Sequence, residues 1–316
     1  MSEGKAKLTP LTATGMYSVH PKRQNISYGR WAIPVMARKM EDPDPLERRR
    51  AVQSMCDYVF DSRRVSSKEF SSNAAGRQAF HKHGFYEEAL KLIDDSDAAV
   101  RNAANIVLQR ISISPIGAES LVKSGAVPKL VERIPKEPDH ILHVLLQTLH
   151  ACCLVDASKC LDFNAVEAVV PLLESADVTV LEKAATVIKD LTVEAEGRTR
   201  VLETKALTPL LDLCASENET VQAKALAAVM MIANETPAKF MAIEKKCIEK
   251  ILPLTIKSNM EIRLNSIKVL TALAEAPPGR MALLGKYQKI VALLNDKVPE
   301  VKRAAVKLVS VVDFVP

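Results

Sequence analysis

The side chains with the most evident metal-binding or catalytic potential in this chain are histidines at short spacings. His143 and His150 lie seven residues apart on one predicted helix. Seven residues of α-helix rise about 10.5 Å, whereas each ligand of a shared zinc ion lies about 2.0–2.1 Å from the metal. We therefore predict that this pair is partly buried or contacts a partner. His81 and His83 flank a predicted helix end, where a cationic imidazole complements the helix dipole, so we predict a solvated role for them.

The cysteines and the absence of catalytic motifs argue against an enzyme. The six cysteines form no CxxC pair and lie mostly on predicted apolar helix faces, as is typical of reduced core residues. They are Cys56, Cys152, Cys153, Cys160, Cys214 and Cys247. The sequence contains no P-loop, GxSxG or HExxH motif. We predict a protein with no catalytic residues, cofactor, metal or small-molecule substrate.

The elements that carry these side chains repeat along the chain, and residues 196–234 contain one complete copy. A short helix over residues 197–203 is followed by a second that we expect to start at Pro209, because a first-turn N–H has no intrahelical partner to lose. Cap-forming residues at 217–220 precede a third, longer helix with apolar side chains along one face. The block is therefore three helices that share one apolar side.

Two independent markers give the period of this block. The usually small residue in the third helix recurs, in steps of 41, 39, 41, 41 and 39, as Ala104, Leu145, Ala184, Ala225, Ser266 and Ala305. A marker in the first helix recurs, in steps of 41, 40, 40, 41 and 41, as Gly76, Gly117, Ala157, Gly197, Ala238 and Gly279. A period near 40 is typical of armadillo and HEAT arrays, and three helices per unit favour armadillo. We predict an all-α solenoid of about six full repeats plus an N-terminal partial repeat.

The repeat pattern also predicts the domain boundaries. No linker interrupts the period, so we expect one solenoid over residues 28–316, with a partial unit at 28–60, a surface loop at 61–75 and full units at 76–316. Residues 1–27 show no apolar period and are predicted to form an extended or disordered arm. No apolar run is long enough to span a bilayer and no secretory signal is evident, so we expect an intracellular protein that does not bind membranes.

The charge distribution narrows the class of partner. Residues 1–78 contain 14 Lys and Arg against 8 Asp and Glu, whereas the rest of the chain contains 29 against 30. A near-neutral array argues against binding of nucleic acid, which requires a basic stripe along many repeats. The basic N-terminal unit favours an acidic protein neighbour instead, and Arg48, Arg49 and Arg50 are its candidate contacts.

Armadillo arrays bind partners along a groove lined by their third helices, so candidate site residues are expected there. Nuclear-import adaptors of this class carry a Trp and, four residues later, an Asn on successive third helices. The equivalent pairs in this chain are Ile106/Arg110, Gln147/Ala151, Thr186/Asp190, Ala227/Met231, Lys268/Ala272 and Lys307/Val311, and none of them matches. The single Trp31 lies outside this series. Polar candidates for binding an acidic or mixed-charge peptide or helix are Arg101, Asn105, Lys183, Lys224, Arg263 and Lys268.

Two separated blocks resemble one family. Residues 261–281, EIRLNSIKVLTALAEAPPGRM, together with the terminal VVDFVP, resemble the radial spoke head protein 14 family of cilia and flagella. The N-terminal stretch SYGRWAIPVMARKMEDPDPLERRRAVQSMCDYVFDS is similar to the opening unit of that family, including Tyr28-Gly29 and Cys56-Asp57. The loop at 63–73 and the IPKEPDH turn fall outside the match.

The resemblance implies a structural, non-catalytic subunit of the axonemal radial spoke, bound to other spoke proteins and supporting ciliary motility. The axoneme is then the expected location. A competing hypothesis is a cytosolic armadillo adaptor or assembly factor that carries axonemal or other protein cargo. The sequence alone does not distinguish these two functions.

Overall fold

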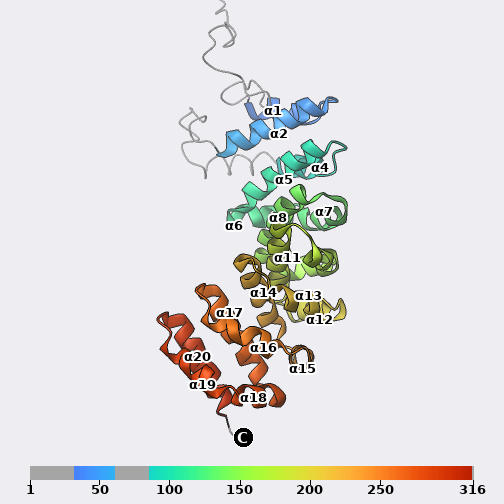
Figure 1. Cartoon of the computed structure of the whole chain (residues 1–316). Helices are drawn as coiled ribbons and strands as arrows, with labels where there is room; N and C mark the ends of the chain where they lie inside the picture. Colours follow the sequence, from blue (N-terminus) through green and yellow to red (C-terminus); the bar gives the residue numbers. More distant parts are fainter. Residues whose placement is uncertain (1–31, 61–84, 315–316) are drawn as a thin grey trace, which may run out of the picture. The chain divides into compact units, whose positions relative to one another are not determined.

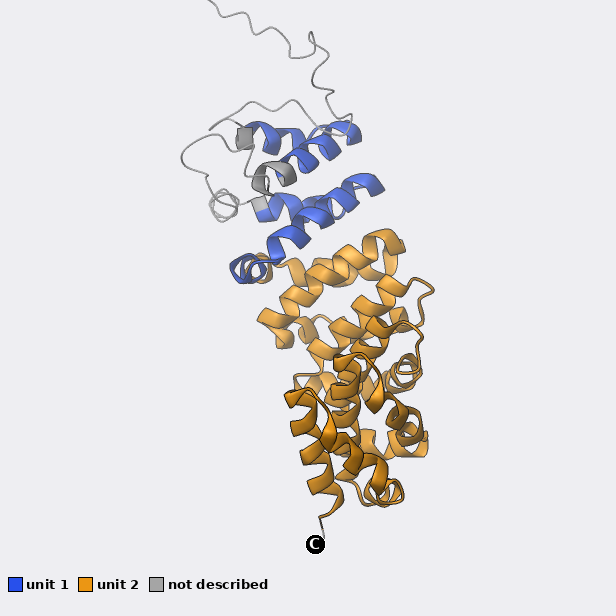
Figure 2. Ribbon diagram, turned by 60° about the vertical axis from the view of Figure 1, so that its left-hand side comes forward, with its two compact units in different colours: residues 1–120 blue, residues 121–316 orange. Residues whose placement is uncertain are grey.

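A computed structural model of the chain describes residues 32–60 and 85–314, in two compact units, residues 1–120 and residues 121–316 (Figures 1 and 2). The arm predicted at 1–27, the loop predicted at 61–75, Trp31, His81 and His83 lie outside the described residues. The described residues are helical and contain no strand.

Unit 1 contains the partial repeat and most of the first full repeat. Its helices are α1 (Ala32–Met40), α2 (Pro45–Phe60), α4 (Phe85–Leu92), α5 (Ala98–Ser112) and the start of α6 (Pro115–Lys123). Helix α2 packs against both α1 and α5, and α5 also packs against α4. The partial repeat therefore covers one face of the first long helix.

Unit 2 continues with the same three-helix repeat. After the end of α6, its helices are α7 (Ala126–Arg133), η2 (Ile134–Lys136), α8 (Asp139–Val155), α9 (Ala157–Asp162), α10 (Ala165–Val169), η3 (Val170–Glu174), α11 (Val178–Leu191), α12 (Ala195–Glu203), α13 (Leu207–Leu213), α14 (Glu219–Ile232), α15 (Thr236–Glu244), α16 (Cys247–Ile251), η4 (Leu252–Ile256), α17 (Met260–Ala274), α18 (Pro277–Leu284), α19 (Tyr287–Ala292), η5 (Leu293–Asn295) and α20 (Pro299–Val312). The second helix of the 196–234 repeat, α13, begins at Leu207, before the start predicted at Pro209.

Four of the long third helices begin where the sequence supplies a capping side chain. Asp97, Asp177, Asn218 and Asn259 precede α5, α11, α14 and α17, and each side chain accepts hydrogen bonds from the backbone N–H groups two and three residues later. These bonds satisfy donors that have no carbonyl partner within the helix. The starts of these four helices are thus encoded locally, whereas Pro138 before α8 and Val298 before α20 provide no side-chain cap.

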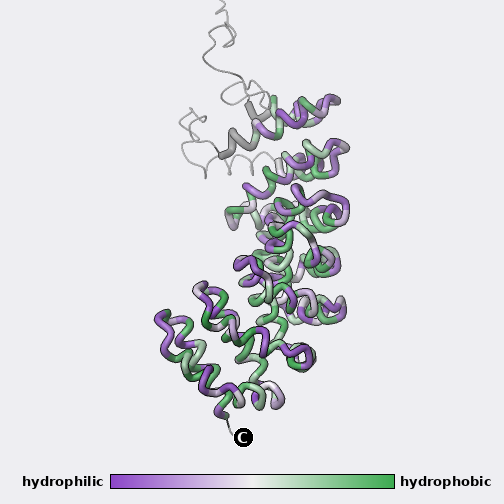
Figure 3. Tube along the Cα trace, viewed as in Figure 1, coloured by the Kyte–Doolittle hydropathy of each residue, from purple (hydrophilic) through white to green (hydrophobic). Residues whose placement is uncertain are grey.

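The small-residue marker lies at the centre of the helix packing. Ala104, Ala184, Ala225, Ser266 and Ala305 are all 0% exposed. Within unit 2, α8 packs against α11, α11 against α14, α14 against α17 and α17 against α20. A small side chain at this position lets neighbouring long helices approach closely, and Figure 3 shows hydrophobic and hydrophilic residues alternating along them.

The glycine marker has a different steric cause. A β-carbon added at Gly117, Gly197 or Gly279 would lie 2.1, 2.0 or 2.1 Å from the carbonyl oxygen of Ile111, Leu191 or Leu273, respectively. Each of these oxygens belongs to the end of the preceding long helix. The first helix of a repeat therefore contacts the preceding third helix through bare backbone.

We predict that Gly197→Ala lowers the free energy of unfolding by about 1–3 kcal/mol, because the added methyl group forces the backbone of α12 away from Leu191. The measurement is urea denaturation followed by circular dichroism. The matched control is Gly285→Ala, where the nearest atom would lie 3.5 Å away and φ is −63°. Equal stability of the two variants would contradict this steric explanation.

Candidate functional site

The third helices of unit 2 line a concave pocket. Helices α14, α17 and α20 lie side by side, and a pocket of about 540 Å³ opens between them. Its apolar lining includes Met230, Met231, Leu264 and Ala272. We call this pocket, with its lining side chains, the α14–α20 groove.

Charged side chains surround this apolar floor. Arg303 forms an ion pair with Glu300 at 3.0 Å, and Glu275 with Lys239 at 2.5 Å. Lys268 and Lys307 line the groove, are exposed, and form no ion pair with any residue that the structure describes. The groove therefore presents two unneutralised cations beside an apolar surface.

Positions compared above with the import-adaptor pairs account for much of this lining. Met231, Lys268, Ala272 and Lys307 all line the groove. At these four positions, this chain carries thioether, ammonium and methyl groups in place of the Trp and Asn of the import adaptors. Of the predicted site residues, only Lys268 lines the groove. Lys307 could have been selected because it is the repeat equivalent of Lys268, and Met231 because it holds the position of the adaptor Asn. Met230 and Arg303 hold neither of the two adaptor positions.

Two predicted lysines are paired with carboxylates. Lys183 lies 3.1 Å from Glu182, and Lys224 lies 2.9 Å from Glu261. The second pair joins α14 to α17, so Lys224 helps to hold neighbouring repeats together. Both side chains are partly exposed.

Two predicted arginines stabilise the turns that precede the long helices. Arg101 donates to the carbonyl oxygens of Asp95 and Ser96. Arg263 donates to the carbonyl oxygens of Lys257 and Ser258 and also forms a 2.8 Å ion pair with Asp296. In each case the guanidinium satisfies carbonyls that the chain reversal leaves without helical partners. These arginines have a structural role.

Asn105 does not reach the surface. It is 0% exposed, and its side-chain amide donates to the carbonyl oxygen of Arg101 one helical turn earlier. The prediction that Asn105 contacts a partner is therefore corrected, because its position faces the core side of α5.

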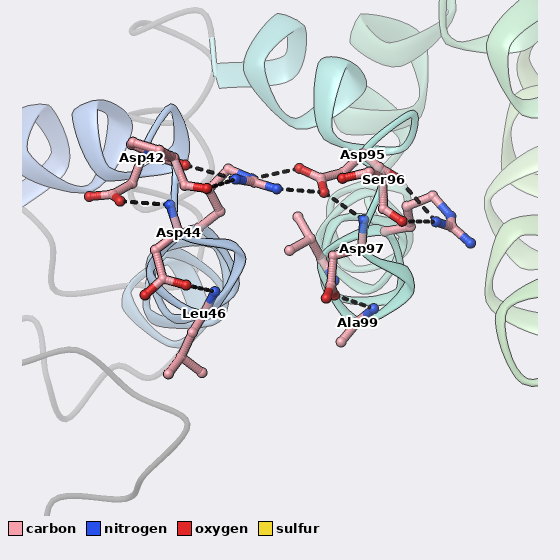
Figure 4. A network of polar contacts seen from close by, with 11 residues as sticks. Asp42, Asp44, Leu46, Asp95, Ser96, Asp97 and Ala99 are labelled. Carbon is pink, nitrogen blue, oxygen red and sulfur yellow. Dashed lines mark hydrogen bonds and ion pairs between the residues drawn. The ribbon is translucent and has the colours of Figure 1, made fainter.

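The basic N-terminal cluster is also largely engaged within its own unit. Arg48 is bonded through Nε and Nη2 to Asp95 at 2.7 and 2.8 Å, and through Nη1 to the carbonyl oxygens of Asp42 and Pro43 (Figure 4). Arg50 donates to Glu47 at 2.8 Å. Arg48 and Arg50 are therefore not free cations of the basic surface predicted from the sequence, since Arg48 joins α2 to the turn before α5 and Arg50 is bonded to Glu47. For Arg49 the partner contact stays a prediction.

The two central histidines differ in their surroundings. Both are partly buried, and Nδ1 of His150 on α8 contacts a carboxylate oxygen of Asp190 on α11. The other oxygen of Asp190 lies 2.6 Å from Lys189. Asp190 is buried, and its carboxylate is paired with the Lys189 ammonium and in contact with the imidazole of His150. The prediction of partial burial is confirmed for both histidines.

The described cysteines are core residues. Cys152, Cys153, Cys160, Cys214 and Cys247 are buried free thiols. Burial raises the pKa of Cys152 and of Cys247 to about 12, so both stay protonated at neutral pH and are poor nucleophiles. In the ranges 32–60 and 85–314, no cluster of three or more His, Cys, Asp or Glu has an arrangement suited to a metal ion. The helices of these ranges also lack the combined length and apolarity that crossing a bilayer requires.

Three solved structures with the same architecture are engineered or designed proteins. An engineered protein superposes with a TM-score of 0.75 at 17% identity, over 90% of this chain and 79% of its own. A designed armadillo repeat protein matches with a TM-score of 0.67 at 21% identity, over 76% of this chain and 99% of its own. Another, in complex with the peptide (KR)4, gives a TM-score of 0.66 at 21% identity, with the same coverage. Comparison with models of known protein families gives no match. The fold is therefore an all-α, armadillo-type solenoid, as predicted.

The Arg263–Asp296 pair predicts a pH dependence of stability. Burial favours a higher pKa of the Asp296 carboxyl, but hydrogen bonds from Arg263 and from the backbone N–H of Val298 outweigh it and lower the pKa. The stabilisation is thus fully present above the unfolded-state pKa of about 4 and is lost as pH falls through the lower folded-state value.

We predict that Asp296→Asn lowers the free energy of unfolding by about 1–3 kcal/mol at pH 7, and that its difference from the unmodified protein shrinks as the medium is acidified. Denaturant titrations between pH 3 and pH 7 measure this difference. The control is Asp212→Asn, which removes an exposed pair with Lys250 at 3.4 Å and has little effect. A gap that stays constant with pH would contradict the prediction.

Proposed function

We propose that this chain is a non-catalytic scaffold subunit of the axonemal radial spoke, which binds other spoke proteins through its groove and supports ciliary and flagellar motility. The main supporting observation is an armadillo-type solenoid whose α14–α20 groove has an apolar floor and two cations that form no ion pair with any described residue. Preformed solenoid surfaces suit binding of protein segments, since little ordering entropy is lost on association.

The spoke assignment is supported by the two sequence blocks that resemble the radial spoke head protein 14 family. In the structure, residues 261–281 run through α17 and α18 and contribute Leu264, Lys268, Thr271, Ala272 and Glu275 to the groove. The family-like block therefore contributes to the groove in which we propose that the partner binds.

We place the main partner contact in this groove and not at the N-terminal arginines. Arg48 and Arg50 are engaged within unit 1, so a neighbour would have to displace existing ion pairs. The groove cations, Lys268 and Lys307, are already exposed, so a partner can bind them without breaking an ion pair that the structure describes.

The test is retention on the axoneme. We predict that the chain, tagged at its C-terminus in a ciliated cell, stays with detergent-stripped axonemes in moderate salt and leaves only together with known spoke subunits. Quantitative immunoblotting across a salt series measures the retained fraction. A tagged tubulin-binding protein and a soluble ciliary-matrix protein serve as the retained and released controls.

Release of the chain into the detergent-soluble fraction, while spoke subunits remain on the axoneme, would contradict the spoke assignment. That outcome would favour the cytosolic adaptor or assembly factor, whose fold would be the same.

A further inference from the structure

The repeat identifies which residues continue one edge of the groove beyond α14, toward α11 and α8. Asn234 and Glu275 line the pocket, and they occupy equivalent positions just after α14 and α17. One and two repeats earlier, the same position is held by Val193, just after α11, and by Leu154, near the end of α8. These four residues form a series that we call the groove edge.

The groove edge changes chemistry along unit 2. Leu154 is 66% exposed and Val193 is 58% exposed, and Val155 beside Leu154 is 40% exposed. These side chains leave apolar area in water that a partner could cover. At the α14 and α17 positions the edge is polar. Of these four residues, the two apolar ones therefore lie at the α8–α11 end, whereas Phe314, which holds the equivalent position after α20, is a third apolar side chain and is 58% exposed.

The charged side chains of the groove are distributed differently from Leu154 and Val193. At the α8–α11 end, Lys189 is paired with the buried carboxylate of Asp190, which His150 also contacts. At the α17–α20 end, Lys268 and Lys307 lack carboxylate partners among the described residues, and they occupy the same position in adjacent repeats. Unneutralised positive charge is therefore concentrated at the end opposite to Leu154 and Val193.

These two gradients fit a single extended occupant. Neighbouring packed helices lie about 8–10 Å apart, so the four steps from α8 to α20 span roughly 32–40 Å. An extended chain advances about 3.3 Å per residue, so a segment of about 12 residues covers this distance. Carboxylates two or three residues apart would then meet Lys268 and Lys307.

We propose that unit 2 binds an extended segment of another protein, about 12 residues long, with one acidic half and one apolar half. The acidic half lies over Lys268 and Lys307, and the apolar half covers Leu154 and Val193. This proposal rests on the proposed scaffold function and specifies its ligand. It also distinguishes this chain from the designed armadillo protein that is bound to the basic peptide (KR)4, since a basic segment would meet like charge here.

The proposal is tested with the full chain and a displayed library of random twelve-residue peptides. Selection uses the unmodified chain, with counter-selection against the variant Lys268→Glu/Lys307→Glu. We expect enriched peptides to carry at least two Asp or Glu in one half and Leu, Ile, Val, Met or Phe in the other. An enriched peptide is then labelled and titrated by fluorescence anisotropy.

The expected dissociation constant rises about tenfold or more for Lys268→Glu/Lys307→Glu, because two attractive contacts become repulsive. It rises about fivefold or more for Leu154→Ser/Val193→Ser, which removes exposed apolar surface. The control, Lys289→Glu/Lys302→Glu, makes the same change in net charge at exposed lysines outside the groove and alters binding less than twofold.

Three results would overturn the proposal: no enrichment, enrichment of basic or uncharged peptides, or equal weakening by the control variant. Each leaves axonemal retention unchanged as a separate measurement, so failure here is distinguishable from failure of the spoke assignment. Conversely, a chain that binds such peptides but leaves the axoneme with detergent would support this inference and contradict the spoke assignment.

Discussion

The contact between the first helix of a repeat and the end of the preceding long helix sets the geometry of the stack. At Gly117, Gly197 and Gly279 there is no space for a β-carbon, since a carbonyl oxygen occupies it. Alanine takes the same place at Ala157 and Ala238, so not every repeat requires the closest approach. Where it occurs, the direction of the chain leaving a long helix is fixed by backbone contact. The orientation of the next three helices follows from it.

Much of the fold could be predicted because its determinants are local and periodic. The caps Asp97, Asp177, Asn218 and Asn259 act within three residues, and the small-residue series marks the buried centre of each long helix. The candidate site was harder to predict. Arg263 has the composition of a groove cation, but its guanidinium is used by carbonyls five and six residues earlier and by Asp296 in the next repeat. Such competition between internal and external partners depends on three-dimensional distances that no sequence spacing specifies.

Position within the repeat and residue type contribute separately to the groove. Adjacent long helices share some lining positions, since Lys268 and Lys307 are equivalent, as are Met231 and Ala272, whereas the side chains at such positions can differ. A substitution at one of these positions changes one contact to a partner and leaves the helix packing beneath it intact. Asn105 shows the limit of this separation, because one position further round the helix a polar side chain is buried.

Some ion pairs of unit 2 join one repeat to the next, namely Lys224–Glu261 and Arg263–Asp296, and others, Arg198–Glu235 and Lys239–Glu275, join the first helix of a repeat to the residues that follow its third helix. They lie away from the small-residue core, most with at least one partly exposed partner, and dissolved ions screen such charges. The glycine contacts are steric and do not respond to salt. Bending of unit 2 would therefore strain ion pairs that salt weakens, while the glycine contacts stay unchanged. We expect unit 2 to bend more easily as the ionic strength rises, with the stacking order of its helices retained.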